Sequence, residues 1–324
     1  MTAPRAAVPG PGFIALEGPG SRVEVVPSHG GRIRALVLGG RDWLVRPAAD
    51  AVPRAEASVL AGAGWDECAP AAAAGTVPEW VKGYGGRAIP AGGEARLQVP
   101  SIELRTGADG HRLRCTWRGE RLPWTLERTL HLRADGTLEV RYEATNIGEQ
   151  RLPFLWSACL VMPLDGTTRL KLPDAARLRV QSITGADGAA VLGGTHQWPR
   201  LTLEGRSRDL ATPWELPRRA SVQAWVDLGR ARSQVQVRQG AQALTIGVDG
   251  AGGLHCGLLL DRGAARSGVR GGLLSRRVPA LVLQPSLGAP DRLADALGDW
   301  QAVAWLTPGE VRQWSLTLKA GSGP

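Results

Sequence analysis

Polar and apolar residues alternate with a period of two through much of the chain. The clearest alternating stretches are residues 22–26, 96–99, 101–104, 112–117 and 233–238. Alternation places successive side chains on opposite faces of an extended backbone, which is typical of antiparallel strands with one buried face. The pattern therefore predicts a protein built mainly of antiparallel β-strands.

Two Asp-Gly pairs mark tight turns between such stretches. Asp135-Gly136 separates residues 129–132 from 138–142, and Asp109-Gly110 separates residues 101–104 from 112–117. Asp-Gly favours the two-residue turns of β-hairpins, because glycine adopts positive φ without strain. We therefore expect an antiparallel meander over about residues 95 to 145.

Helical signals are few, and nothing divides the chain into domains. Pro290 and Asp291 have the residue types that start a short helix, which we expect to end near Leu297. No linker and no repeat of fixed length interrupts the strand pattern. We predict an all-β antiparallel sandwich with minor helix, forming a single domain over residues 1–324 with residues 1–12 as a flexible N-terminal tail.

Composition and charge describe a globular protein without an obvious macromolecular partner. The chain has 324 residues, of which 43% are hydrophobic and 21% are charged, so it can bury a substantial core. The net charge is +9, but the arginines are spread along the chain rather than gathered into a stripe, so we expect no nucleic-acid partner. No apolar run is long enough to cross a membrane. We expect no membrane partner and a cytoplasmic location.

The cysteines and the short motifs argue against metal or cofactor chemistry. Cys68, Cys115, Cys159 and Cys256 lie 47, 44 and 97 residues apart, which is neither zinc-ligand spacing nor a disulfide framework. We expect buried free thiols. The glycine-rich nucleotide and phosphate motifs and the zinc-hydrolase motif are also missing from the sequence. We expect no metal and no cofactor.

Four segments, in this order, resemble the galactose mutarotase (aldose 1-epimerase) family. Residues 27–44 resemble its opening hairpin with a glycine pair, and residues 64–70 are similar to its G-W-D-E-x-x-P loop. Residues 152–159 resemble its P-F-L-W-S-x-H strand, and residues 283–293 with 306–316 resemble its closing E-P-x-x-G-x-P-D-x-L and L-x-P-G-E strands. The resemblance implies a β-supersandwich with a cleft on one face that takes a small-molecule sugar.

The residues that the family uses for proton transfer are replaced here. Mutarotation needs a base for the anomeric hydroxyl and an acid for the ring oxygen, and the family supplies a glutamate and histidines. Gln284 matches the glutamate, Cys159 matches the strand histidine, and Gly92 matches a loop histidine. An amide cannot carry a proton, and burial raises the pKa of a thiol above its usual 8.5. The resemblance therefore implies weak or no epimerase activity, and we assign no catalytic residue.

The resemblance also names candidate sugar-binding residues. We expect Trp65, Asp66, Glu67, Cys159 and Gln284 to line the cleft, with the two acidic residues in a Gly-Trp loop as a clamp for sugar hydroxyls. The alternatives are that the acidic residues cap the loop and that Trp65 belongs to the core. His255 is a further candidate because the family cleft is lined by strands from this part of the fold.

Three interpretations of function follow. The first is a carbohydrate-binding, mutarotase-like protein of carbohydrate metabolism with little epimerase activity. The second is an active aldose 1-epimerase, an isomerase, that uses Glu67, Asp66 or His255 in place of the missing residues. The third is a protein-interaction sandwich that binds no sugar.

Overall fold

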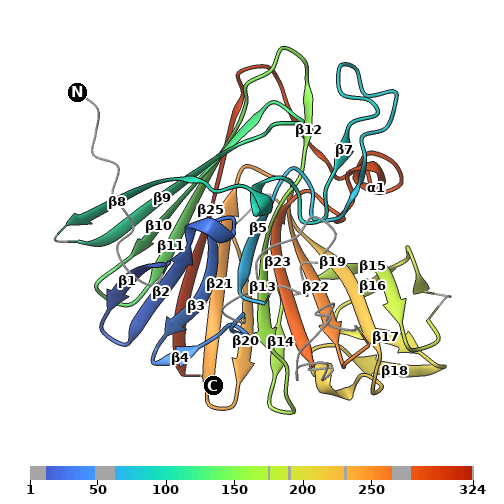
Figure 1. Cartoon of the computed structure of the whole chain (residues 1–324). Coiled ribbons are helices and arrows are strands. Elements are labelled where there is room, and N and C mark those ends of the chain that lie inside the picture. The colour runs from blue at the N-terminus through green and yellow to red at the C-terminus, as the bar shows by residue number, and fades with distance from the viewer. Residues whose placement is uncertain are drawn as a thin grey trace.

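The computed structural model describes residues 12–47, 63–107, 109–173, 176–188, 191–229, 232–264 and 279–322. In this part of the chain, strands dominate and the α-helical content is one short helix, α1 (Leu293–Leu297). Two large antiparallel sheets pack face to face (Figure 1). The predicted all-β class and the short helix before Leu297 are confirmed. The expected N-terminal tail, residues 1–12, falls outside the described residues except for Gly12.

The first sheet has eleven described strands and carries most of the segments that resemble the mutarotase family. Its central strands come from distant parts of the chain, so its order is set by long-range pairing. In spatial order the strands are β1 (Ile14–Gly18), β2 (Ser21–Val26), β3 (Arg32–Leu38), β5 (Trp65–Cys68), β13 (Trp156–Pro163), β23 (Ala280–Leu287), β22 (Leu254–Asp261), β19 (Ser221–Gly229), β15 (Arg177–Thr184) and β16 (Thr195–Gln197), with β4 (Arg41–Asp42) paired to β3.

The second sheet has eight described strands and contains the predicted meander. In spatial order the strands are β14 (Arg169–Lys171), β20 (Ser233–Gln239), β21 (Gln242–Gly250), β25 (Val311–Ser322), β11 (Leu138–Asn146), β10 (Trp124–Leu132), β9 (Gly110–Arg118) and β8 (Ser101–Gly107). Both Asp-Gly signals fall at the hairpins of this sheet, where Leu132 pairs with Leu138 and Gly107 pairs with Gly110. The meander is confirmed.

Short elements close the two ends of the sandwich. Among the described residues they are three two-stranded sheets and three short 3-10 helices: β6 (Gly75–Thr76) with β7 (Ala88–Ile89), β12 (Leu152–Phe154) with β24 (Ala304–Leu306), β17 (Arg200–Leu203) with β18 (Arg206–Asp209), η1 (Pro27–His29), η3 (Ala95–Leu97) and η5 (Pro213–Glu215). After η1, Gly30 and Gly31 both have φ near +70°, which supports the predicted glycine turn before β3.

Two local predictions are wrong. Residues 96–99 were expected to form a strand, but Ala95–Leu97 is a 3-10 helix, because Arg96 turns inward and its guanidinium binds a buried carboxylate. Residues 64–70 were expected to form a loop, but Trp65–Cys68 is strand β5 in the middle of the larger sheet. Its two consecutive acidic residues hide the strand pattern, since each is buried against a different arginine.

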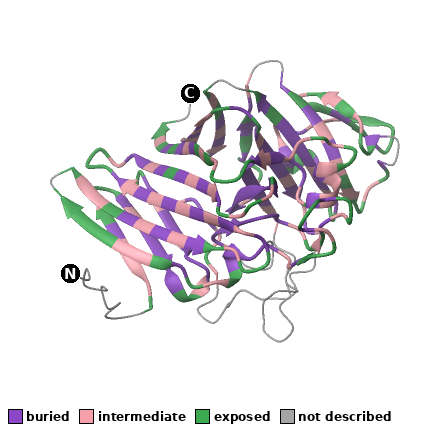
Figure 2. Cartoon of the chain, turned by 90° about the horizontal axis from the view of Figure 1, so that it is seen from above, coloured by how far each residue is buried: buried purple, intermediate pink, exposed green. Residues whose placement is uncertain are grey.

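The core lies between the two sheets. Buried and less buried residues alternate along β9, β10 and β11, which appear as stripes in Figure 2. The inward positions hold leucines and large aromatic side chains, among them the fully buried Trp117, Trp124 and Trp156. Tyr142 packs against both Trp156 and Trp314, with ring centroids 4.4 and 5.5 Å away, and the two indoles lie 4.9 Å from each other. Apolar burial on this scale is the main stabilisation of the sandwich.

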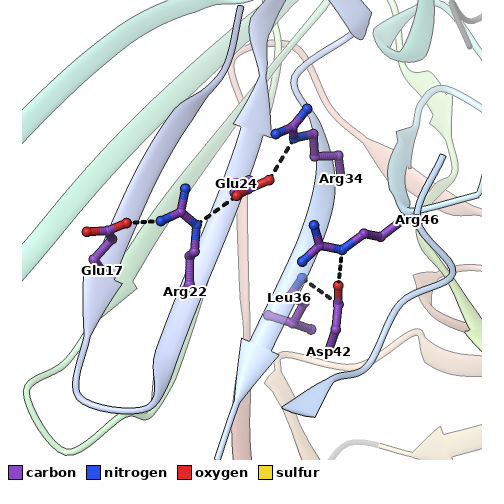
Figure 3. Close-up of polar contacts among 7 residues, drawn as sticks. All are labelled: Glu17, Arg22, Glu24, Arg34, Leu36, Asp42 and Arg46. Atoms are coloured by element: carbon purple, nitrogen blue, oxygen red, sulfur yellow. Dashed lines mark hydrogen bonds and ion pairs between the residues drawn. The ribbon is translucent and has the colours of Figure 1, made fainter. Parts of the chain in front are cut away.

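A ladder of charges covers the other face of the N-terminal strands (Figure 3). Arg22 bonds to Glu17 and also to Glu24, whose second carboxylate oxygen accepts from Arg34 Nε at 2.7 Å. Arg46 bonds to Asp42 on the neighbouring strand β4 at 2.6 Å. Most of these side chains are partly exposed, so each pair contributes little stability on its own. They keep this face of β1, β2 and β3 polar.

One buried ion pair joins the two sheets through the core. Arg128 Nη1 on β10 lies 3.0 Å from Glu67 Oε1 on β5, and both side chains have no exposed surface. Tyr142 donates its hydroxyl to Glu67 at 3.0 Å and Trp156 donates its indole N–H at 2.7 Å. Burial raises the pKa of Glu67, although Arg128 and these donors act against the rise. The carboxylate is held entirely by protein groups.

This geometry predicts an asymmetric cost for removing the pair. Arg128→Met leaves Glu67 charged and buried without its cation, and we expect it to lower the free energy of unfolding by about 3–5 kcal/mol. The double variant Glu67→Gln with Arg128→Met removes the charge, and the amide can accept from the Trp156 indole through its oxygen while its NH2 donates to the Tyr142 hydroxyl, so it should recover most of that loss. Urea unfolding of both variants measures the difference. A double variant no more stable than Arg128→Met would contradict a charged Glu67.

Candidate functional site

The predicted cleft residues on β5 point to opposite faces of the larger sheet. Trp65 and Glu67 face the core between the sheets, and Trp65 is fully buried there. Asp66 and Cys68 face the other way, onto what we call the outer face, the side of the eleven-stranded sheet that points away from the second sheet. The structure therefore does not bring Trp65 and Glu67 to the face that carries Asp66.

Asp66 is occupied by two buried arginines. Arg32 on β3 binds both of its carboxylate oxygens, with Nε 2.6 Å and Nη2 2.9 Å away, and Arg96 on η3 adds Nε at 3.0 Å. All three residues are at most 2% exposed. Bidentate pairing of this kind fixes geometry strongly. Asp66 therefore ties β5 to β3 and η3 at the edge of the candidate site.

The two matched positions lie together on the outer face. Gln284 Nε2 on β23 is 3.3 Å from Cys159 Sγ on β13, and Cys68 Sγ is 3.6 Å from Cys159 Sγ. All three side chains are buried. The contact with Cys159 and burial raise the pKa of Cys68 well above its usual value. The matched positions form a contiguous but uncharged cluster.

The third matched position, Gly92, adjoins the arginine that binds Asp66. Gly92 has a φ of +78°, and a Cβ atom there would come within 2.5 Å of Arg96 Cδ and 2.9 Å of its Nη1. A histidine at this position would need Arg96 to move. Arg96 can therefore bind Asp66 in this position only because residue 92 has no side chain.

Asp291 is a titratable group at the site, although its place after Pro290 predicts only the start of a short helix. Its Oδ1 atom accepts from Gln284 Nε2 at 3.2 Å, and its Oδ2 atom accepts from Gln223 Nε2 on β19. Burial raises the pKa of Asp291 to about 6, although these two amide hydrogen bonds act against the rise. Asp291 lies seven residues after Gln284 in the same matched segment, and this short spacing was the one sign in the sequence that it could reach the site. Its contact with Gln284 depends on the chain turning back toward β23, which is a tertiary feature.

Gln284 retains unused hydrogen-bonding capacity. Its amide nitrogen donates to Asp291 and Cys159, whereas its Oε1 atom is buried with no hydrogen-bond partner in the described part of the chain. Gln284 is 4% exposed. Buried acceptors of this kind normally have a partner, so a hydroxyl or a water molecule is expected to complete it.

His255 and Trp225 extend the outer face beside Gln284. On β22, Gly257 pairs with Gln284 and His255 pairs with Ser286, two positions further along. His255 Nδ1 lies 3.0 Å from the Gly253 carbonyl, and in the neutral ring that N–H donates and leaves Nε2 as an acceptor. Burial lowers the pKa of His255. Trp225 lies across Gly257, where an added Cβ would be 2.9 Å from the indole.

The described residues were compared with the side-chain groups that hold metal ions and with the helices that cross membranes. They contain no group of three or more His, Cys, Asp or Glu side chains arranged to hold a metal ion. None of the described helices is long and apolar enough to cross a bilayer. The four cysteines are free thiols. A cytoplasmic location stays a prediction.

The fold matches solved structures over nearly their whole length. No model of a known protein family matches the sequence, and no curated protein matches it. The Slr1438 protein of Synechocystis superposes with a TM-score of 0.66 at 14% identity, covering 100% of this chain and 99% of that one. A galactose mutarotase-like protein from Lactobacillus casei gives 0.60 at 15% identity, covering 96% and 100%. Another from Clostridium acetobutylicum gives 0.63 at 10% identity, covering 96% and 95%.

These likenesses identify the class of fold. The chain has the galactose mutarotase-like β-supersandwich that the matched segments implied. At such low identity they define architecture and not activity. The chemistry of the site has to be argued from its own residues.

The raised pKa of Asp291 predicts how stability depends on pH. An unfolded aspartate releases its proton near its ordinary value of 3.8, whereas folded Asp291 keeps it to about pH 6. Stability should therefore fall as pH rises from about 4 to 6, on the order of 2 kcal/mol, and then level off. Asp291→Asn should lack this component. Urea unfolding of both proteins between pH 4 and 7 tests it, and parallel pH profiles would contradict the assigned burial.

Proposed function

We propose that the chain binds a sugar on the outer face of the eleven-stranded sheet, around Gln284, and that it is weak or inactive as an aldose 1-epimerase. The observation that carries the proposal is the contact between Gln284, at the matched base position, and Cys159, at the matched acid position. The fold and the matched segments support a site there, but an amide and a buried thiol cannot exchange protons efficiently at neutral pH.

Each candidate residue then has a distinct role. Gln284 offers its unpaired Oε1 to a sugar hydroxyl, and His255 offers Nε2 on the same face. Cys159 is buried and packs against the amide of Gln284. Asp66 acts indirectly by fixing β5, and Trp65 and Glu67 support the same strand from the core side.

A second candidate function is favoured by Asp291. Its carboxyl group lies one hydrogen bond from Gln284, and its pKa of about 6 makes both protonation states available near neutral pH. An active epimerase would use the carboxylate to take the anomeric hydroxyl proton while water protonates the ring oxygen and the bond between C1 and the ring oxygen breaks. Glu67, with both oxygens bonded in the core, is a weaker candidate for this step.

Binding and catalysis can be separated in one set of measurements. We expect titration with a panel of neutral hexoses to change the tryptophan fluorescence, because Trp225 adjoins Gln284, and Gln284→Ala to weaken binding at least tenfold. Gln313→Ala, on the exposed face of the other sheet, is the matched control and should bind normally.

The rate of mutarotation of α-glucose and α-galactose is measured alongside. Binding without acceleration supports the first proposal. Acceleration that Asp291→Asn removes and Gln313→Ala leaves unchanged supports the second candidate. A folded protein that neither binds nor accelerates contradicts both and leaves the protein-interaction interpretation.

Restoring the family residues is the second test. Cys159→His with Gln284→Glu returns an imidazole and a carboxylate to adjacent strands, and we expect a gain in mutarotation on the order of 10²-fold or more. Each single reversion should gain little, because acid and base act as a unit. The new glutamate would face Asp291, where two carboxylates share one proton, so adding Asp291→Asn should shift the pH optimum downward. A folded double variant at the background rate would show that Arg96 beside Gly92 also blocks the site.

A further inference from the structure

Strand β8 is an edge strand with an unusually exposed surface. It ends the eight-stranded sheet, pairs with β9 on one side and lies outermost in Figure 1. Five of its seven residues are exposed and the other two are intermediate. Leu104 is 41% exposed at its centre. Exposed edge strands offer a row of backbone groups to another strand.

The hairpin fixes which backbone groups face the free edge. Gly107 pairs with Gly110 across a two-residue connection, and such a flanking pair exchanges both backbone hydrogen bonds. Counting back by two, residues 105, 103 and 101 also point their backbone groups toward β9. The amide and carbonyl groups of Ile102, Leu104 and Thr106 therefore point outward, and no hydrogen bond from another described segment reaches them.

The side chains of β8 are complementary to themselves. If a second β8 pairs antiparallel with Leu104 opposite Leu104, then Ile102 faces Thr106 and Glu103 faces Arg105, each twice. Ile102, Leu104 and Thr106 would exchange backbone bonds across the axis, because their backbone groups point outward. Opposite charges facing each other across strands are stabilising and like charges are destabilising. The strand Ser101–Gly107 is centred on Leu104, so this register uses all of it.

Neighbouring registers are worse for definite reasons. A shift by one residue places an outward backbone group opposite an inward one, which breaks the ladder. Centring the pair on Glu103 sets two carboxylates face to face, and centring it on Arg105 sets two guanidinium groups face to face. The charges therefore select the register centred on Leu104.

We propose that a second copy of this chain docks on β8, antiparallel and centred on Leu104, to make one continuous sheet across a two-fold dimer. Leu104 pairs with the fully buried Leu113 on the core side of β9, so the contact extends an existing apolar row. Glu103 and Arg105 already bond within one chain at 3.1 Å and would also bond across the axis. A strand of this length buries a small area, so a reversible dimer is expected.

A cysteine placed at the axis tests the register directly. In the proposed dimer the two Leu104 positions form a hydrogen-bonded pair, with Cα atoms about 5.5 Å apart, within the range of a disulfide. Leu104→Cys should therefore form a covalent dimer with oxidised glutathione as the oxidant. Thr106→Cys should not, because position 106 faces position 102 of the other copy. The native cysteines are buried and should contribute little background.

Charge exchange tests the same contact without a crosslink. Arg105→Glu places like charges opposite each other twice and should weaken dimerisation at least tenfold in sedimentation equilibrium. Adding Glu103→Arg restores opposite charges in reversed order and should recover the dimer. Arg232→Glu, at an exposed arginine just before β20, is the matched control.

The outcomes are decisive for the edge and independent of sugar binding. A dimer that responds to Arg105→Glu and recovers with Glu103→Arg supports the proposal. A monomer at all concentrations, a dimer indifferent to these charges, or equal crosslinking through positions 104 and 106 would overturn it. A variant lacking residues 1–11 tests a rival occupant of the β8 edge. A dimer that forms only in this variant would show that the N-terminal residues of the same chain cover β8.

Discussion

The structure depends on two neighbouring carboxylates on one buried strand. Asp66 and Glu67 are consecutive on β5, so their side chains leave opposite faces of the larger sheet, and each meets its own arginine partners. Arg128 binds Glu67 from the second sheet, whereas Arg32 and Arg96 bind Asp66 from the same sheet and from η3. A buried charge is tolerated only when it is paired and fully hydrogen-bonded. These ion pairs therefore fix β5 relative to β10 of the second sheet and relative to η3, the 3-10 helix that precedes β8.

The same constraint shapes the candidate site. Arg96 reaches Asp66 by passing next to Gly92, so the guanidinium fills space that a side chain at position 92 would need. On the adjacent strands, Cys68, Cys159 and Gln284 fill the outer face with neutral groups. The substitutions at positions 92, 159 and 284 therefore belong to one cluster. In this cluster, packing and hydrogen bonds between uncharged groups take the place of the family's glutamate and histidines.

Much of this architecture was readable from the sequence, and the exceptions have a common cause. Alternation and Asp-Gly turns predicted the meander, because those signals are local. Matching segments also placed Cys159 and Gln284 together correctly, although they are 125 residues apart. Strand β5 and residues 96–99 were misassigned because their polar side chains are satisfied by partners at least 30 residues away. Pattern rules treat such residues as exposed, and a single sequence contains no measure of distant pairing.

Asp291 gives the substitution at position 284 a physical meaning. A glutamate there would lie within hydrogen-bond distance of a second carboxylate that has no cationic partner among the described residues, and the two would compete for one proton. Glutamine avoids that repulsion and donates its amide to Asp291 instead, while Gln223 donates from the other side. The carboxyl group nearest to position 284 is then that of Asp291, in the turn before α1. The matched base is absent and a carboxyl with a pKa of about 6 remains beside it, so the chemistry left at the site depends on whether a ligand reaches that carboxyl.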